Sequence, residues 1–155
     1  MKRKILSIFL GLLAITAFSQ TENDYLEIVR DVLKTEKKAA IAEVMMLSEE
    51  ESQPFWTLYN QFESALYEVH NKRINIIKDY ADNYETMTDE KADDLTNRMF
   101  KFEAELMKIE KSYYSKFKKI IPAGKAAKLM QANNKIETMV NYELAASIPL
   151  VETTK

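Results

Sequence analysis

Residues Phe55 to Ile120 carry the pattern from which the architecture follows, FWTLYNQFESALYEVHNKRINIIKDYADNYETMTDEKADDLTNRMFKFEAELMKIEKSYYSKFKKI. Apolar residues recur there in alternating steps of three and four, and on the outward run only Arg73 breaks the series. The outward series is Tyr59, Phe62, Leu66, Val69, Ile76 and Tyr80, and the returning series is Leu95, Met99, Phe102, Leu106, Ile109 and Tyr113. This period is typical of two amphipathic helices that pack along a narrow seam. We therefore predict a long antiparallel helical hairpin that turns at residues 84–88.

The composition favours an all-helical fold around this hairpin. The chain of 155 residues has room for one domain, and its 2 glycines and 3 prolines leave little material for strands joined by tight turns. Because there is no cysteine, disulfides, thiolate catalysis and cysteine metal sites are excluded. We predict an all-α fold of four helices in a single domain, residues 20–147, followed by an extended tail, residues 148–155.

The N-terminus has the pattern of a secretory signal peptide. Basic residues fill positions 2–4, an apolar run covers 5–15, and Ala17 and Ser19 place small residues where signal peptidase reads them. The alternative, a membrane anchor, requires about 20 apolar residues, which is more than this run provides. A lipoprotein is excluded because its modified cysteine is missing. We expect export to the periplasm and cleavage after Ser19.

Removal of the signal peptide would change the net charge of the chain, and the new charge bears on which classes of partner it can bind. Without residues 1–19 the chain keeps 19 basic and 24 acidic residues, a net charge of −5. An acidic protein is a poor candidate for nucleic-acid binding. His70 is the single histidine and is expected to be structural, so neither a histidine metal site nor a serine–histidine pair is expected. We predict a protein that is not an enzyme and uses no cofactor.

Signals for helix ends divide the remaining chain. The first helix is expected from about Asp24 to Met45. Ser48 and Glu51 then have the spacing of a capping box, which is a strong helix start. Pro54 leaves two alternatives: the second helix begins at Ser48 and bends, or it begins near Ser52. The capping box favours the first alternative.

Three more signals lie downstream of the hairpin turn. Thr86 or Thr88 can cap the returning helix, which we expect to end near Ile120. Pro122 can be the first residue of a fourth helix, on whose inner side Asn133 must find hydrogen-bond partners. The tail that contains Pro149 is expected to be extended and to lie back on the domain.

The hairpin is polarised in charge. Residues 82–94 contain six carboxylates against one lysine, whereas residues 108–128 contain seven lysines against one glutamate. One explanation is that both clusters complement helix dipoles and keep the surface soluble. The other is that two molecules pack antiparallel, the acidic tip of one against the basic base of the other.

The basic end also carries the candidate binding surface. Lysines alternate there with aromatic residues, and methionines such as Met99 and Met107 add adaptable side chains. The lysines and aromatic residues are Lys111, Tyr113, Tyr114, Lys116, Phe117, Lys118, Lys119, Lys125 and Lys128. Such a surface can hold unfolded or acidic polypeptide without strict sequence preference. Two alternatives stay open: the aromatic residues belong to the core, or the lysines contact membrane headgroups without anchoring the protein.

Two helix starts support a family resemblance. Leu47-Ser48-Glu49-Glu50-Glu51 is echoed by Ile121-Pro122-Ala123-Gly124-Lys125, and each is followed at the same offset by an apolar pair. Together with export and the absence of cysteine, this plan resembles the Spy/CpxP family of small periplasmic stress proteins, which carry two Leu-Thr-x-x-Gln motifs. The motif positions are Leu47, Ser48, Glu51, Ile121 and Pro122, where serine and glutamate replace threonine and glutamine in the first copy. Residues 134–146 also resemble exported proteins labelled sensors of ECF-type sigma factors.

The resemblance implies an antiparallel, cradle-like homodimer. Such a dimer either protects unfolded envelope proteins without ATP or restrains a membrane stress sensor. The basic face of the family maps onto the hairpin, where Arg73, Lys101, Lys108 and Lys111 are the expected contributors, beside Tyr114 and Lys116 from the pattern above. The first functional hypothesis is therefore a chaperone-like polypeptide-binding protein, the second a regulator with one specific partner, and the third a structural envelope protein.

Overall fold

The computed structural model describes residues 34–151, and the chain divides into two units, Met1–Glu43 and Val44–Lys155. In the first unit, residues 34–43 are helical, and this helix continues through residue 45 at the start of the second. The predicted helix end at Met45 is thus confirmed. The signal peptide, the cleavage site after Ser19, the first part of the predicted helix from Asp24 and the last four residues of the tail lie outside the described residues.

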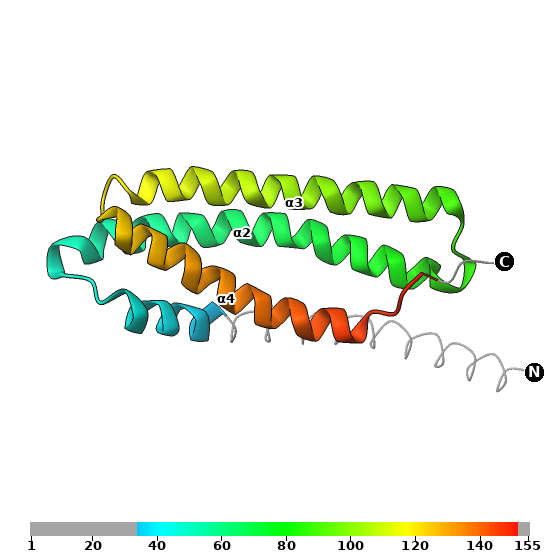
Figure 1. Ribbon diagram of the computed structural model, residues 1–155, viewed down its shortest axis with the longest axis horizontal. Helices are drawn as coiled ribbons and strands as arrows, with labels where there is room; N and C mark the ends of the chain where they lie inside the picture. Colours follow the sequence, from blue (N-terminus) through cyan, green and yellow to red (C-terminus); the bar gives the residue numbers. More distant parts are fainter. Residues whose placement is uncertain (1–33, 152–155) are drawn as a thin grey trace, which may run out of the picture. The chain divides into compact units, whose positions relative to one another are not determined.

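The second unit consists of three α-helices and a short 3₁₀ turn. They are α2 (Glu49–Asn83), η1 (Tyr84–Thr86), α3 (Asp89–Phe117) and α4 (Ala123–Ser147). Helices α2 and α3 lie side by side and antiparallel along their length, and α4 runs back along the α2 side of this pair (Figure 1). The described residues contain no strand. The all-α fold and the antiparallel hairpin are therefore confirmed.

Helix α2 begins at the predicted capping box. The backbone N–H of Ser48 donates to Glu51 Oε2 at 2.9 Å, and the backbone N–H of Glu51 donates to Ser48 Oγ at 3.3 Å. The backbone N–H of Ser52 donates to the Ser48 carbonyl at 3.0 Å, so the first turn is closed. Of the two alternatives, the helix that starts at Ser48 is correct, and Pro54 lies inside it. A proline this close to the start removes a single helical hydrogen bond, which the rest of the first turns tolerate.

The other helix ends follow simple capping chemistry. Thr88 caps α3, because its Oγ1 accepts from the backbone N–H of Lys91 at 3.2 Å. Helix α3 ends at Phe117, three residues before the predicted Ile120, and residues 118–120 form a turn. Pro122 takes the N-cap position of α4, so that helix begins one residue later than predicted. Met46, just after the helix that ends at residue 45, has a φ of 46°, the left-handed conformation common at helix C-termini.

The core of the second unit has an aromatic base and an aliphatic distal part. At the base Phe55 and Phe117 are fully buried with ring centroids 5.5 Å apart, and Phe62 contacts Phe117 edge-on at 6.0 Å. Toward the hairpin turn, Val69, Ile76, Leu95 and Phe102 form a second buried cluster. The periodicity therefore predicted Phe62 and the distal cluster correctly. Phe117, which was assigned to the candidate binding surface, belongs instead to the core.

Several polar side chains join helix α4 to α2. His70 Nε2 lies 3.2 Å from Glu137 Oε1, and Arg73 donates to Asn141 Oδ1. The Tyr80 hydroxyl donates to the Pro149 carbonyl at 2.9 Å, which holds the start of the tail against α2. The tail thus lies back on the domain at Pro149, although Leu150 beyond it is 89% exposed.

Asn133 is buried on the inner side of α4, as predicted, but it is only partly satisfied. Its Nδ2 donates to Glu137 Oε1 at 3.4 Å, and among the described residues its Oδ1 has no hydrogen-bond partner. Tyr59 is also buried, and burial, followed by the nearby Glu63 carboxylate, raises the pKa of Tyr59 above its usual range. The base therefore combines an aromatic core with buried polar groups.

Candidate functional site

The side of α3 turned away from α2 carries exposed apolar residues. Phe102 is buried against α2, whereas Phe100 is 63% exposed and Met107 is 54% exposed. Phe100, Met107 and Tyr114 are seven residues apart, close to two helical turns, so they follow one side of the helix. Large apolar side chains in a row on a solvent-facing surface are typical of interaction sites.

Three of the predicted site lysines lie on this same side. Lys101, Lys108 and Lys111 are exposed, and they alternate along α3 with Phe100, Met107 and Tyr114. We name the set of these six residues the α3 outer face. The structure therefore brings together four of the six predicted binding residues, Lys101, Lys108, Lys111 and Tyr114.

Among residues 34–151, the lysines of the α3 outer face have no carboxylate partner, in contrast to cations elsewhere in the hairpin. Lys72 pairs with Glu105 and Lys91 pairs with Asp79, each at 2.6 Å, and Arg98 also pairs with Asp79. These last two contacts hold the pKa of the Asp79 carboxyl below its usual range, Lys91 being the larger cause. Within residues 34–151, Lys101, Lys108 and Lys111 have no carboxylate at ion-pair distance. No described carboxylate neutralises these three ammonium groups.

At the C-terminal end of α3, Lys116 of the helix and Lys118 just after it lie over aromatic rings. Lys116 Nζ lies 4.3 Å from the centroid of the Tyr113 ring, and Lys118 Nζ lies 4.6 Å from that of Tyr114. A cation over a ring face is attracted by the ring quadrupole, by about 0.5–1 kcal/mol at an exposed site. These contacts orient the two ammonium groups without neutralising them.

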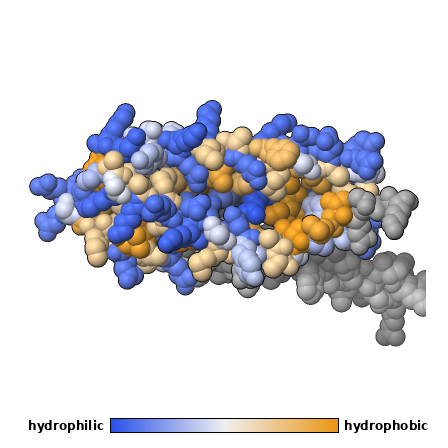
Figure 2. Space-filling view, in the orientation of Figure 1, coloured by the Kyte–Doolittle hydropathy of each residue, from blue (hydrophilic) through white to orange (hydrophobic). Residues whose placement is uncertain are grey.

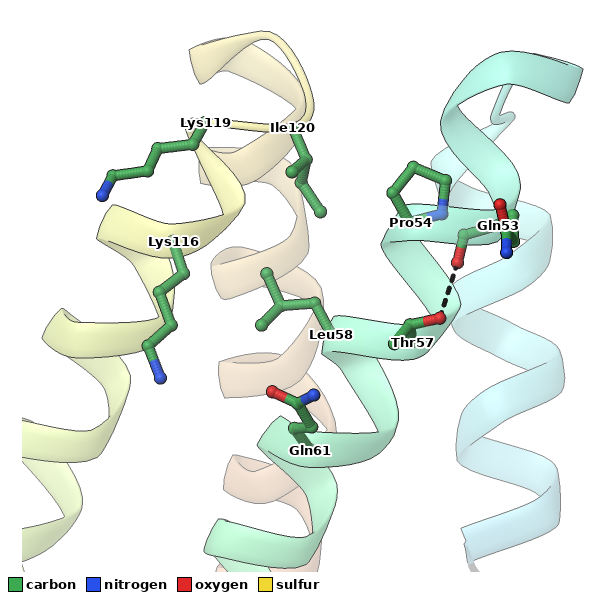
Figure 3. A pocket seen from close by; sticks show the side chains of 8 residues that line it. All are labelled: Gln53, Pro54, Thr57, Leu58, Gln61, Lys116, Lys119 and Ile120. Carbon is green, nitrogen blue, oxygen red and sulfur yellow. Dashed lines mark hydrogen bonds between the residues drawn. The ribbon is translucent and has the colours of Figure 1, made fainter.

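Lys116 also borders a groove between the start of α2 and the end of α3. The groove has a volume of about 470 Å³ and is lined by Gln53, Pro54, Thr57, Leu58, Gln61, Lys116, Lys119 and Ile120. Leu58 and Ile120 point into the space between the helices, Lys116 lies alongside on α3, and Lys119 extends away from the other labelled side chains (Figure 3). Thr57 Oγ1 donates to the Gln53 carbonyl at 3.0 Å. We name this feature the α2–α3 groove.

Arg73, the sixth predicted binding residue, lies elsewhere. It comes from α2, donates to Asn141 of α4, and its guanidinium carbon lies 5.9 Å from the centroid of the Phe102 ring. Arg73 therefore connects α2 to α4 and is not brought together with the lysines of the α3 outer face. In the sequence, Arg73 is the one polar residue in the apolar series of the outward helix. That pattern could not indicate which helix its side chain would contact.

A second apolar surface lies over the other half of the unit. On the face seen in Figure 2, hydrophobic residues gather over the C-terminal halves of α2 and α4 and the tail. Val140 is 41% exposed and Val151 is 44% exposed in this region. Arg73 donates to Asn141 in this region, so it joins α2 to α4 there.

The motif residues meet at the base of the unit. Glu51 Oε2 lies 2.5 Å from Lys125 Nζ, so the first helix start pairs with the second. Lys128 Nζ donates to the Val44 carbonyl at 2.5 Å. The bond from Lys125, followed by that from the Ser48 backbone N–H, holds the pKa of the Glu51 carboxyl below its usual range. Leu47 is half-buried and Ile121 is buried, so these motif positions stabilise the base and do not line the α3 outer face.

Sequence reasoning did not identify Phe100, Leu58 or Ile120 as candidate binding residues. Phe100 could have been found, because its seven-residue spacing to Met107 and Tyr114 is visible in the sequence once the seam has been assigned to other positions. Leu58 and Ile120 could not be found in this way, because the groove depends on how the turn after α3 lies against α2.

In residues 34–151, no group of three or more histidine or carboxylate side chains is placed to hold a metal ion. No helix in that range is both long and apolar enough to cross a membrane.

Comparison with known proteins adds no relative to this picture. No family model, no curated protein and no solved structure matches the chain. The α3 outer face and the α2–α3 groove are therefore the features of this chain that indicate a function.

Proposed function

We propose that this protein is an exported, ATP-independent, chaperone-like protein that binds acidic, unfolded polypeptide segments on the α3 outer face. The observation that carries the proposal is the alternation of exposed Phe100 and Met107 with Lys101, Lys108 and Lys111, none of which has a carboxylate partner among the described residues. Apolar side chains supply affinity that depends little on sequence, and unpaired lysines select acidic segments and speed encounter.

The resemblance to the Spy/CpxP family supports the same proposal. It also favours a homodimer, in which the acidic tip of one copy faces the basic base of the other. Asp82, Glu85 and Asp89 near the hairpin turn are exposed and, within residues 34–151, have no ion-pair partner. Sedimentation velocity tests this arrangement: the dimer should dissociate as salt rises from about 0.05 to 1 M, because salt screens surface charge. A monomer at low salt would contradict it.

Aggregation assays test the proposed function directly. A denatured acidic protein and a denatured basic protein are diluted separately into buffer with near-stoichiometric amounts of the full chain, and light scattering is followed. We expect strong suppression for the acidic client and weak suppression for the basic one. Inactivity toward both, together with one tight partner recovered from the envelope, would replace the proposal by a regulatory role. Cosedimentation with anionic vesicles at equal or higher affinity would instead assign the face to membrane headgroups.

A pair of charge reversals localises the binding surface. Lys108→Glu changes an exposed lysine on the α3 outer face, and Lys135→Glu changes an exposed lysine on α4 by the same amount of charge. We expect Lys108→Glu to weaken client protection several-fold and Lys135→Glu to leave it near wild type, because the charge of the first lies within a Debye length of the bound segment. Equal effects of the two variants would show that only net charge matters and would reject this face.

A further inference from the structure

The α2–α3 groove has the chemistry of an anchor site for one apolar side chain. Pro54, Leu58 and Ile120 supply an apolar lining, and glutamine, threonine and lysine side chains surround it (Figure 3). None of the eight lining residues is acidic, and Lys119 has no carboxylate partner in the described part of the chain. A site that combines an apolar lining with a cationic edge favours an apolar residue whose neighbours are acidic.

The groove lies on a flank that continues from the α3 outer face. Lys101 and Lys108 are two turns apart, and the same flank reaches Lys116 at the groove. Glu105, the acidic residue on this flank, is already neutralised by Lys72 at 2.6 Å. A segment bound on this flank therefore meets Lys101, Lys108 and Lys116 in turn and an apolar site at the end of the helix.

The length of this path sets the length of the segment. Lys101 and Lys116 are separated by fifteen helical residues, which corresponds to about 22 Å at 1.5 Å per residue. An extended polypeptide rises about 3.3 Å per residue, so about seven residues cover the path. A segment with carboxylates along its length and one large apolar side chain at its end matches both parts of the surface.

We infer that the α2–α3 groove anchors a large apolar side chain at the end of an acidic client segment of about seven residues, whose carboxylates lie on the lysines of α3. This inference rests on the proposed function and adds a sequence preference to it. The occupant is an extended stretch of client polypeptide, selected by charge complementarity with α3 and by the apolar lining of the groove.

Two labelled peptides test the inference by fluorescence anisotropy with the full chain. Both have ten residues and the same number of glutamates, and the glutamate run ends in leucine in one and in serine in the other. Burial of a leucine side chain predicts about tenfold tighter binding of the leucine peptide. Gln61→Trp and, separately, Gln53→Trp place an indole at the edge of the groove, and each should reduce the affinity for the leucine peptide to that for the serine peptide.

Asn75→Trp is the matched control, because Asn75 is an exposed residue of α2 outside the groove. It should keep the preference for leucine, and circular dichroism should give the same helicity for all three variants. If wild type binds both peptides equally, the groove inference is overturned and the proposed function stands. If wild type binds neither, both are overturned. A leucine preference that survives in both groove variants, or is lost in Asn75→Trp, also rejects the groove as the anchor.

Discussion

The carboxylate of Glu51 and the ammonium of Lys125 lie 2.5 Å apart, and they join the first residues of α2 to the first residues of α4. Glu51 also closes the capping box with Ser48. One side chain thus caps the start of α2 and connects it to the start of α4, although Glu51 and Lys125 are 74 residues apart in the sequence. Glu51 therefore contributes to the stability of the base, whereas its neighbours Glu49 and Glu50 are exposed.

Glu51→Gln should make the free energy of unfolding less dependent on pH in the acidic range. Because the pKa of Glu51 is lowered in the folded state, its carboxylate stabilises the protein above the unfolded glutamate pKa of about 4.3, and this contribution is lost as pH falls through the lower folded pKa. The free energy of unfolding from urea titrations should differ between wild type and Glu51→Gln at pH 7, and the difference should shrink toward pH 3. Glu50→Gln, one residue away, is the control. A difference that is constant over this range would contradict the assignment.

Ser48→Ala should lower the free energy of unfolding by about 1 kcal/mol, because it removes the acceptor for the backbone N–H of Glu51. Ser115→Ala is the comparison, since Ser115 lies within α3 and its hydroxyl donates to the Lys111 carbonyl. Alanine is a better helix former at such a position, so that variant should stay within about 0.5 kcal/mol of wild type. Urea denaturation measures both, and equal losses would mean that the cap contributes nothing particular.

Alanine substitutions of two phenylalanines on α3 should have different effects, one on stability and the other on client binding. Phe117 is fully buried at the aromatic base, and Phe117→Ala should cost about 3–5 kcal/mol or leave the protein unfolded. Phe100 is 63% exposed, and Phe100→Ala should change stability by less than about 0.5 kcal/mol while client protection falls. Thermal denaturation and the light-scattering assay report the two properties. A Phe100→Ala variant with wild-type protection would count against the α3 outer face.

Met46→Gly should stabilise the protein by about 1 kcal/mol. The φ of Met46 is 46°, a left-handed conformation in which the Cβ causes steric strain. Glycine has no Cβ and adopts this conformation without that strain. The side chain is 77% exposed, so little packing is lost. Met46→Ala keeps the Cβ and should match wild type. The melting temperatures of the three proteins test this, and a glycine variant less stable than the alanine variant would refute the explanation.

The periodicity predicted the hairpin because burial in α2 and α3 depends on side-chain spacing along each helix. Val69, Leu95 and Phe102 are buried in the structure because an amphipathic helix has one face to bury, whatever its partner. The capping box at Ser48 was equally legible, because all of its atoms come from four consecutive residues. Local rules could not place Arg73, whose partner Asn141 is 68 residues away.

By itself the sequence determined the hairpin helices, the capping box at Ser48, the seam and the polarity of charge, because each of these depends on residues a few positions apart. Only the tertiary structure decided which charges remain unpaired. Lys72 and Lys101 look alike in sequence, but Glu105 reaches Lys72 across the hairpin while Lys101 has no carboxylate partner within residues 34–151. The tertiary structure also formed the α2–α3 groove, since Leu58 and Ile120 meet only when the turn after α3 lies beside the start of α2. Contacts between distant parts of the chain depend on helix packing, which no local pattern encodes.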